Sequence, residues 1–382
     1  MSGPFARWGA MAKVGVRMMF HDRLKLAGTL FGVVFATLLA DQQLGVLLGL
    51  LSKNLMFVDH AGADLWVLPA GAQTFQPGKP ISLSALTATE VVPGVAWAEP
   101  LIYAGGTLSL PGGGSEPVSV VGTRAPRYKG GPWNLVAGSA EALARPDAMI
   151  FEDSEREKLG GLNLGSVREL NGRRVVAAGF TWGLLPFGPS YSFAGYDLAR
   201  ELARFDADRT SYVLAGVAPG ADPAAVKRAV QARNPDLLVL TRAEFKAKIV
   251  TYIFASTGIG ASFGASTGFG LLVGLVIVSL SMFSAVVDNV REFGTLKAMG
   301  ATTGDLAALL LTQSVVYALV GTLIGLGVVS HVADAIRSPK LALVLPWQLY
   351  AGTFGVMLLL CSLASSLALV RLRRVEPAMV FR

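Results

Sequence analysis

Four long apolar runs divide this chain, at residues 26–52, 268–287, 306–329 and 347–370. A helix rises about 1.5 Å per residue, so about 20 residues are enough to cross a hydrocarbon core of about 30 Å. Each run reaches that length. The pattern therefore predicts a polytopic α-helical membrane protein with four transmembrane helices.

The first run is interrupted by three polar residues, Asp41, Gln42 and Gln43. Counted from Asp22 at one interface, Asp41 lies about 28 Å along a helix, close to the opposite headgroups. We therefore expect the three polar residues to lie at the interface, where they need not be buried. The alternative is that Asp41 lines a substrate path, because carboxylates inside a membrane are usually functional.

Residues 53–250, between the first and second runs, follow a different pattern of short β-rich segments broken by Gly and Pro. Asp222 is placed to cap a helix from Pro223 to Arg233, and a strand at Leu237–Leu240 follows, which indicates a βαβ unit. We expect a large α+β domain of about 200 residues, a usual domain size. The other predicted strands are Asp64–Leu68, Val95–Tyr103, Pro117–Val121, Arg174–Phe180 and Ser211–Val217.

Two further segments near this domain have distinct compositions. Residues 251–267 are predicted to form a stalk that leads into the second span, with a break between Thr257 and Gly268 permitted by their Gly and Ser content. The loop Thr181–Phe193 is rich in aromatic residues. A buried hydrophobic loop and a partner surface explain it equally well.

The N-terminal segment 1–25 interleaves basic residues with Phe, Trp, Val and Met, which is typical of an amphipathic helix lying in a membrane interface. The alternative is a secretory signal peptide with Leu26–Ala40 as its apolar core. The basic lead is long and no A-x-A sequence precedes Asp41, so we expect the segment to be retained.

Basic residues are distributed unevenly between the short segments. Lys and Arg number five in residues 1–25, two in 288–305 and four in 371–382, against two in the short loop 330–346. The positive-inside rule then places both termini and residues 288–305 in the cytoplasm, and the large domain outside it.

Residues 288–305, between the second and third spans, form a short polar element. Val290, Phe293 and Leu296 fall within an arc of about 120° on a helical wheel, so a small amphipathic helix is predicted. Gly300 suits the left-handed residue that closes a helix, and Lys297 suits the negative end of its dipole.

The sequence REFGTLKAMGA in this element resembles the coupling-helix motif of the FtsX/MacB-type permeases of ABC transporters, and the C-terminal VEPAMVFR is similar to their ending. Within that superfamily, this sequence motif is most similar to that of the DevC-like exporters. Many members carry basic residues after the Gly-Ala and a Glu in the next helix, where this chain has Thr302, Thr303, Gly304, Asp305 and Gln313. By this resemblance, the residues that couple to an ATPase are Val290, Arg291, Glu292, Phe293, Gly294, Leu296, Lys297, Met299 and Gly300.

The resemblance also implies partners and a role. The chain would be a homodimeric permease of the bacterial inner membrane, in contact with membrane lipids, with a MacB-like periplasmic domain and two copies of a separate cytoplasmic ATPase that bind ATP and Mg. A DevC-like complex would export a lipid, glycolipid or other amphiphile through a periplasmic adaptor and a TolC-type channel. The alternatives are an FtsX-like scaffold that activates an envelope hydrolase and a lipoprotein-releasing permease.

Composition agrees with a membrane protein that carries one sizeable soluble domain. The chain is 52% hydrophobic and 15% charged, with a mean hydropathy of +0.53 and a net charge of +7. We attribute the charge to membrane topology rather than nucleic acid, since no nucleic-acid motif accompanies it.

Catalytic motifs are missing or out of place in the sequence. There is no Walker A or H-E-x-x-H motif, and the two G-x-S-x-G matches, around Ser262 and Ser266, lead into a membrane span. The one cysteine, Cys361, and three scattered histidines offer no metal-ligand spacing. We expect a transport permease that is not an enzyme, with no catalytic, cofactor-binding or metal site of its own.

Overall fold

The computed structural model describes residues 4–76, 78–186, 188–335 and 343–372, which divide into two compact units. The helical unit comprises the described residues within Met1–Gly49, Gly260–Arg337 and Leu343–Arg382. The α+β unit comprises those within Leu50–Ile259. In sequence, the α+β unit lies between the first and second long apolar helices.

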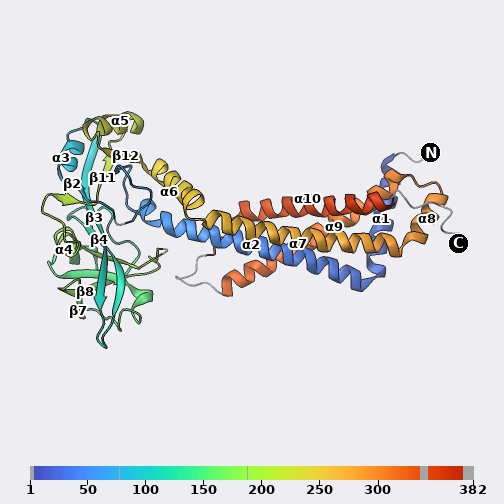
Figure 1. Cartoon of the computed structure of the whole chain (residues 1–382), viewed down its shortest axis with the longest axis horizontal. Helices are drawn as coiled ribbons and strands as arrows, with labels where there is room; N and C mark the ends of the chain where they lie inside the picture. The colour runs from blue at the N-terminus through green and yellow to red at the C-terminus, as the bar shows by residue number, and fades with distance from the viewer. Residues whose placement is uncertain (1–3, 77, 187, 336–342, 373–382) are drawn as a thin grey trace. The chain divides into compact units, whose positions relative to one another are not determined.

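Six helices make up the helical unit in the described part of the chain (Figure 1). Four of them are long and apolar enough to cross a membrane, as the sequence predicts. These four are α2 (Arg23–His60), α7 (Ile259–Asp288), α9 (Thr303–Ala335) and α10 (Trp347–Leu372), and the shorter two are α1 (Pro4–His21) and α8 (Val290–Ala298).

The long helices extend past the bounds expected from hydropathy. Helix α2 continues as one helix to His60, beyond the expected end at residue 52 and into the α+β unit. Helix α7 begins at Ile259, so the second half of the expected stalk is the start of the spanning helix. The break lies at Thr257 and Gly258, where Gly258 has a φ of +71°. It separates α7 from α6 (Arg242–Ser256).

Helix α2 packs on α7 through small side chains that allow close approach. Gly32 faces Ile277, Ala36 faces Gly274, and Leu39 faces Gly270. These positions recur every three or four residues on both helices, so they form one straight antiparallel seam. The neighbouring face of α2 packs on α9 in the same way, with Val33 against Gly321 and Thr37 against Gly325.

The structure corrects the expected exposure of Asp41. Its side chain is 0% exposed, whereas the neighbouring Gln42 is exposed. The hydroxyl of Thr353 on α10 donates to Asp41 Oδ1 at 2.5 Å. Because α2 continues well beyond Asp41, this carboxyl lies within the helix and faces α10. The expectation that it need not be buried is wrong for Asp41, and its place at a membrane interface stays a prediction.

The α+β unit is built on a ten-stranded mixed sheet with the order β12-β1-β11-β3-β4-β9-β6-β8-β5, and β7 pairs with β3 and β8. The pairs β4–β9 and β6–β8 are parallel, and the other pairs in this sheet are antiparallel. The strands are β1 (Leu65–Pro69), β3 (Val95–Ser109), β4 (Ser115–Thr123), β5 (Leu135–Ala137), β6 (Ala148–Glu152), β7 (Val167–Leu170), β8 (Arg173–Thr181), β9 (Tyr191–Gly195), β11 (Tyr212–Val217) and β12 (Leu237–Thr241). Short elements complete the unit: β2 (Ile81–Ser82) paired with β10 (Arg209–Thr210), and the helices α3 (Ser84–Glu90), α4 (Tyr196–Leu202) and α5 (Pro223–Arg233).

The predicted βαβ unit is present, with one strand inserted into it. Strands β11 and β12 flank β1, and both run antiparallel to it, so they are parallel to each other. Helix α5 between them begins where predicted, because the Asp222 carboxylate accepts the backbone N–H groups of Ala224 and Ala225.

An aromatic core joins the end of α2 to the sheet. Phe57 of α2 stacks on Phe75 with ring centroids 4.2 Å apart, and it meets Trp66 of β1 edge-on. Both Phe57 and Trp66 are fully buried. The last turns of α2 are thus an integral part of the α+β unit.

The described part of the aromatic loop Thr181–Phe193 is mostly buried. The carboxylate of Glu152, itself fully buried, accepts hydrogen bonds from the Thr181 hydroxyl and from the backbone N–H groups of Gly183 and Leu184. Trp182 is 44% exposed, whereas Leu184 is buried. Of the two explanations left open, these contacts favour a buried hydrophobic loop; residue 187 lies outside the described residues.

Candidate coupling site

Helix α8 is closed at both ends by local hydrogen bonds. At its start, the N–H of Phe293 donates to the carbonyl of Asn289 at 3.0 Å. At its end, Gly300 donates to Lys297 O and Ala301 to Leu296 O, both at 2.9 Å. Gly300 has a φ of +95°, so this is the left-handed closure that the sequence predicts.

Helix α9 begins shortly after α8, so the connection between the two helices is short. The Thr302 hydroxyl accepts the N–H of Asp305 at 3.2 Å, and the Asp305 carboxylate accepts the N–H of Thr302 at 2.8 Å. This reciprocal cap at Thr302 starts α9 at Thr303, three residues after Gly300. Helix α8 is therefore a short rigid element between two long helices.

The inner face of α8 packs into the helical unit. Phe293 is only 2% exposed, and Val290 and Leu296 are partly buried against the same hydrophobic cluster, which includes Met19 of α1 and Leu310 of α9. A small cavity of about 30 Å³ remains beside Phe293. Gly294 is also buried.

The outer face of α8 carries polar side chains and one methionine. Arg291, Glu292 and Thr295 are exposed, and Met299 is 72% exposed. The Thr295 hydroxyl donates to the Arg291 carbonyl at 2.8 Å within the helix. Lys297 is half-buried between the two faces. The nine residues named from the sequence thus divide between an inner packing face and an outer face open to a partner.

Helix α1 supports the inner face from the other side. The buried Gln313 side chain of α9 donates from Nε2 to the carbonyl of Gly15 at 3.0 Å. A Cβ on Gly15 would lie 3.1 Å from the Leu309 carbonyl oxygen, a tight contact that glycine avoids. The N-terminal helix is therefore a packed part of the helical unit, at the same end as α8 (Figure 1).

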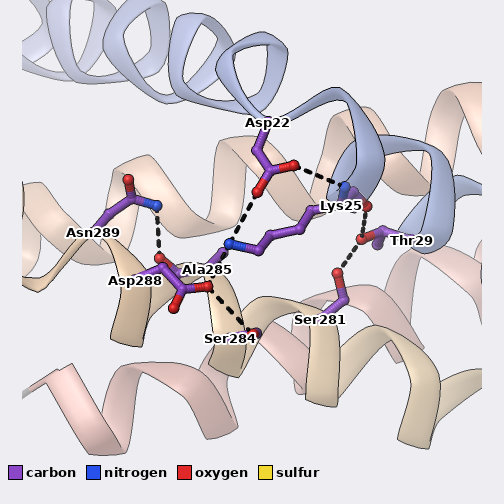
Figure 2. A network of polar contacts seen from close by, with 8 residues as sticks. All are labelled: Asp22, Lys25, Thr29, Ser281, Ser284, Ala285, Asp288 and Asn289. Atoms are coloured by element: carbon purple, nitrogen blue, oxygen red, sulfur yellow. Dashed lines mark hydrogen bonds and ion pairs between the residues drawn. The ribbon is translucent and has the colours of Figure 1, made fainter.

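A polar network that the sequence reasoning missed lies beside α8 (Figure 2). Asp22, in the elbow between α1 and α2, accepts the backbone N–H of Lys25 at 3.1 Å and caps α2. The Lys25 ammonium lies 2.9 Å from Asp22 Oδ2 and also bonds Asp288, the last residue of α7. The hydrogen bond from the Lys25 side chain is the main cause that lowers the pKa of Asp22 below its usual value. The capping position of Asp22 was the one signal in the sequence.

The arrangement suits mechanical coupling better than chemistry. A short amphipathic helix that is closed at its C-terminus by Gly300 and packs on longer helices can pass a displacement of its outer face into the helical unit. Within the described ranges, no group of three or more His, Cys, Asp or Glu side chains is placed to hold a metal ion.

Two solved structures of extracytoplasmic domains are similar to part of this chain. The α+β region is similar to the periplasmic region of MacB from Actinobacillus actinomycetemcomitans, with 10% identity, a TM-score of 0.38, and coverage of 50% of this chain and 94% of that one. It is also similar to the extracellular domain of the ABC-type transporter YknZ from Gram-positive bacteria, with 14% identity, a TM-score of 0.34, and coverage of 47% and 98%.

Comparison of sequences gives one curated relative and one family match. The chain is 40% identical over 65 residues to the uncharacterized ABC transporter permease YknZ of Bacillus subtilis (strain 168), a match that spans 17% of this chain and 16% of that relative. The profile of the FtsX-like permease C-terminal domain matches residues 251–377, which include α7, α8 and α9. Residues 251–377 of this chain therefore match an FtsX-like permease C-terminal domain.

Proposed function

We propose that this chain is the permease subunit of an ABC exporter, in which α8 is the coupling helix that docks on a separate ATPase. Two copies of the chain would assemble with two ATPase subunits. ATP binding and hydrolysis in those subunits would move α8, and the long helices would carry the movement to the α+β unit.

The observation that carries this proposal is the division of α8 into two faces. Phe293 anchors the inner face at 2% exposed, while Arg291, Glu292 and Met299 leave the outer face free in the isolated chain. A helix that only linked two spans would need neither a large buried anchor nor an exposed methionine among charges. Both features suit a docking helix, since large side chains and Arg are enriched in protein interfaces.

The connection from the helical unit to the α+β unit supports transmission of movement. Helix α2 runs without a break from Arg23 to His60. Near its end, the Lys53 ammonium donates to the Leu185 carbonyl at 3.0 Å, and Asp59 pairs with Lys246 of α6 at 2.6 Å. The two helices that leave the α+β unit toward the spans, α2 and α6, are therefore joined to each other within it.

The direction and cargo follow from the family resemblance. We propose export of a lipid, glycolipid or other amphiphile, with an adaptor and a TolC-type channel on the outer side. The chain would lie in the bacterial inner membrane with both termini and α8 in the cytoplasm, because the short segments on that side carry most of the Lys and Arg.

Purification of the tagged full chain from its native membranes tests the assembly. The expected complex contains two permease chains and two ATP-binding subunits, hydrolyses ATP, and loses hydrolysis when the ATP-binding subunits are removed. One permease chain per complex would remove the dimer. ATP hydrolysis by the purified permease alone would contradict the assignment of hydrolysis to a separate subunit. Recovery of an envelope hydrolase or a lipoprotein carrier in place of an adaptor would reject the amphiphile exporter.

A membrane-impermeant thiol reagent tests the orientation. Ser115 is exposed at the start of β4, so a cysteine placed there should react in intact spheroplasts. The native Cys361 is buried and should stay unreactive. Reaction only after lysis would reverse the proposed topology.

A further inference from the structure

The α2–α7 seam changes character toward α8. Its middle is formed by small and apolar contacts such as Gly32 against Ile277 and Ala36 against Gly274. Its end is polar: the Thr29 hydroxyl bonds that of Ser281, and the Lys25 ammonium bonds Asp288 (Figure 2). The pair Thr29–Ser281 continues the antiparallel register of the apolar contacts, whereas the long Lys25 side chain reaches Asp288 about one turn further along α7.

The two kinds of contact restrain the helices differently. Small side chains allow two helices to approach closely, and the van der Waals contacts between them are non-directional. An ion pair and a hydroxyl hydrogen bond are directional and specify which groups stand opposite each other. The polar end therefore adds directional restraints on the axial register that the apolar seam between α2 and α7 begins.

Asp288 stands directly beside the coupling helix. It is the last residue of α7, and the next residue, Asn289, precedes α8 and donates from Nδ2 to the Ala285 carbonyl at 2.8 Å. Ser284 Oγ also donates to Asp288 Oδ2 at 3.4 Å. A displacement of α8 reaches Asp288 before any other cross-helix contact of α7.

We propose that Lys25 is a positioning residue for coupling: its ion pair with Asp288 locks α2 to α7, so that a displacement of α8 moves both helices together. The role of α8 in this statement rests on the proposed function. Without Lys25, α7 would follow α8 and slide past α2, and the part of the movement delivered to the α+β unit through α2 would be lost.

The exposure of the three charged side chains makes the idea testable without unfolding the protein. The side chains of Lys25, Asp22 and Asp288 are 32%, 43% and 49% exposed. Ion pairs this open to solvent add little to stability. A loss of coupling on breaking the pair would therefore not be explained by misfolding.

The first measurement concerns the chain by itself. Spin labels are placed at the exposed Phe31 of α2 and Leu280 of α7 in full-length protein in nanodiscs, with the native Cys361 changed to Ser. We expect a narrow distance distribution for the wild type and for Lys25→Arg, and a broad or shifted one for Lys25→Met and Asp288→Asn. The double variant Lys25→Asp with Asp288→Lys should restore the narrow distribution. A narrow distribution in Lys25→Met would overturn the proposal.

The second measurement concerns coupling in the complex with the ATP-binding subunit that copurifies with the chain. Lys25→Met should retain that subunit but lower cargo export per ATP hydrolysed by at least about fivefold, the low end of usual coupling energies. Full export per ATP in Lys25→Met would overturn the proposal. If the proposed function itself is wrong, a different result is expected. Substitutions on the outer face of α8 would then leave the ATP-binding subunit bound, independently of the distances between the spin labels.

Discussion

Gln313 on α9 donates a hydrogen bond to the backbone carbonyl of Gly15 on α1, 298 residues earlier in the sequence, at 3.0 Å. Both groups are buried. This bond fixes the amphipathic N-terminal helix against the spans at the end that carries α8.

Gln313→Leu should weaken the attachment of α1. The substitution leaves the Gly15 carbonyl buried without its donor, which costs about 1–3 kcal/mol. Faster hydrogen exchange over residues 11–21, with unchanged exchange in α10, would show this. Gln313→Glu is the matched control, because an ionised Glu also lacks a hydrogen-bond donor. If exchange stayed slow in Gln313→Leu but became fast in Gln313→Glu, the effect would come from the buried charge and not from the lost hydrogen bond.

Phe293→Ala should destabilise the helical unit itself. Phe293 is 2% exposed and packs with Met19 and Leu310, so truncation removes a large core side chain, a change that costs about 3–5 kcal/mol in protein interiors. Folding should therefore be affected even though the spans on either side of α8 are untouched. A lower thermal midpoint in detergent for Phe293→Ala than for Phe293→Leu checks it, and equal midpoints would place Phe293 outside the core.

Thr353→Val should destabilise the contact between α2 and α10 more than Asp41→Asn does. The valine leaves Asp41 with neither oxygen bonded, since Oδ2 already has no partner among the described residues, whereas an asparagine can still accept from Thr353. An orphaned buried polar group costs about 1–3 kcal/mol. Thermal unfolding of both variants in one detergent decides the order, and equal midpoints would mean that this hydrogen bond contributes nothing.

The cap of α6 should depend on pH. Thr241 and Glu244 form a capping box, and the hydrogen bond from the Lys227 side chain is the main cause that lowers the pKa of Glu244 below 4.5. Because the folded pKa is below the unfolded one, the stabilisation is present above about pH 4.5 and is lost as pH falls through the folded value. The protection factors of the amides at the start of α6, which correct the observed exchange for its intrinsic pH dependence, should then fall on acidification in the wild type. Glu244→Gln removes the titrating group and the charge that pairs with Lys227, so it should lower these protection factors at neutral pH and abolish their fall on acidification. The same fall in this variant as in the wild type would contradict the assignment.

Local signals in the sequence were sufficient for the parts of the fold that short-range chemistry controls. Asp222 followed by Pro223 predicted the first turn of α5, and the spacing of Val290, Phe293 and Leu296 predicted the buried face of α8. The choice between packing inward and packing on a partner could not be made, because an apolar face looks the same in either case.

Long-range contacts were beyond the sequence. The insertion of β1 between β11 and β12 depends on pairing across about 150 residues, and Lys25 meets Asp288 across 263. The burial of Asp41 was missed for a related reason, since its partner Thr353 lies 312 residues later in the sequence. Hydropathy also gives the length of an apolar run but not where the helix ends, and α2 continues to His60, with Phe57 buried in the α+β unit.

The most direct test of the account is the response of the ATP-binding subunit to changes on the outer face of α8. Arg291→Glu and Met299→Asp alter exposed side chains and should leave membrane abundance unchanged, yet together they should weaken retention of that subunit by at least about tenfold, as loss of interface anchors commonly does. Arg145→Glu, an exposed arginine of the α+β unit, is the matched control and should have no effect. Full retention and full export in the Arg291→Glu, Met299→Asp double variant would contradict the claim that α8 is the coupling helix.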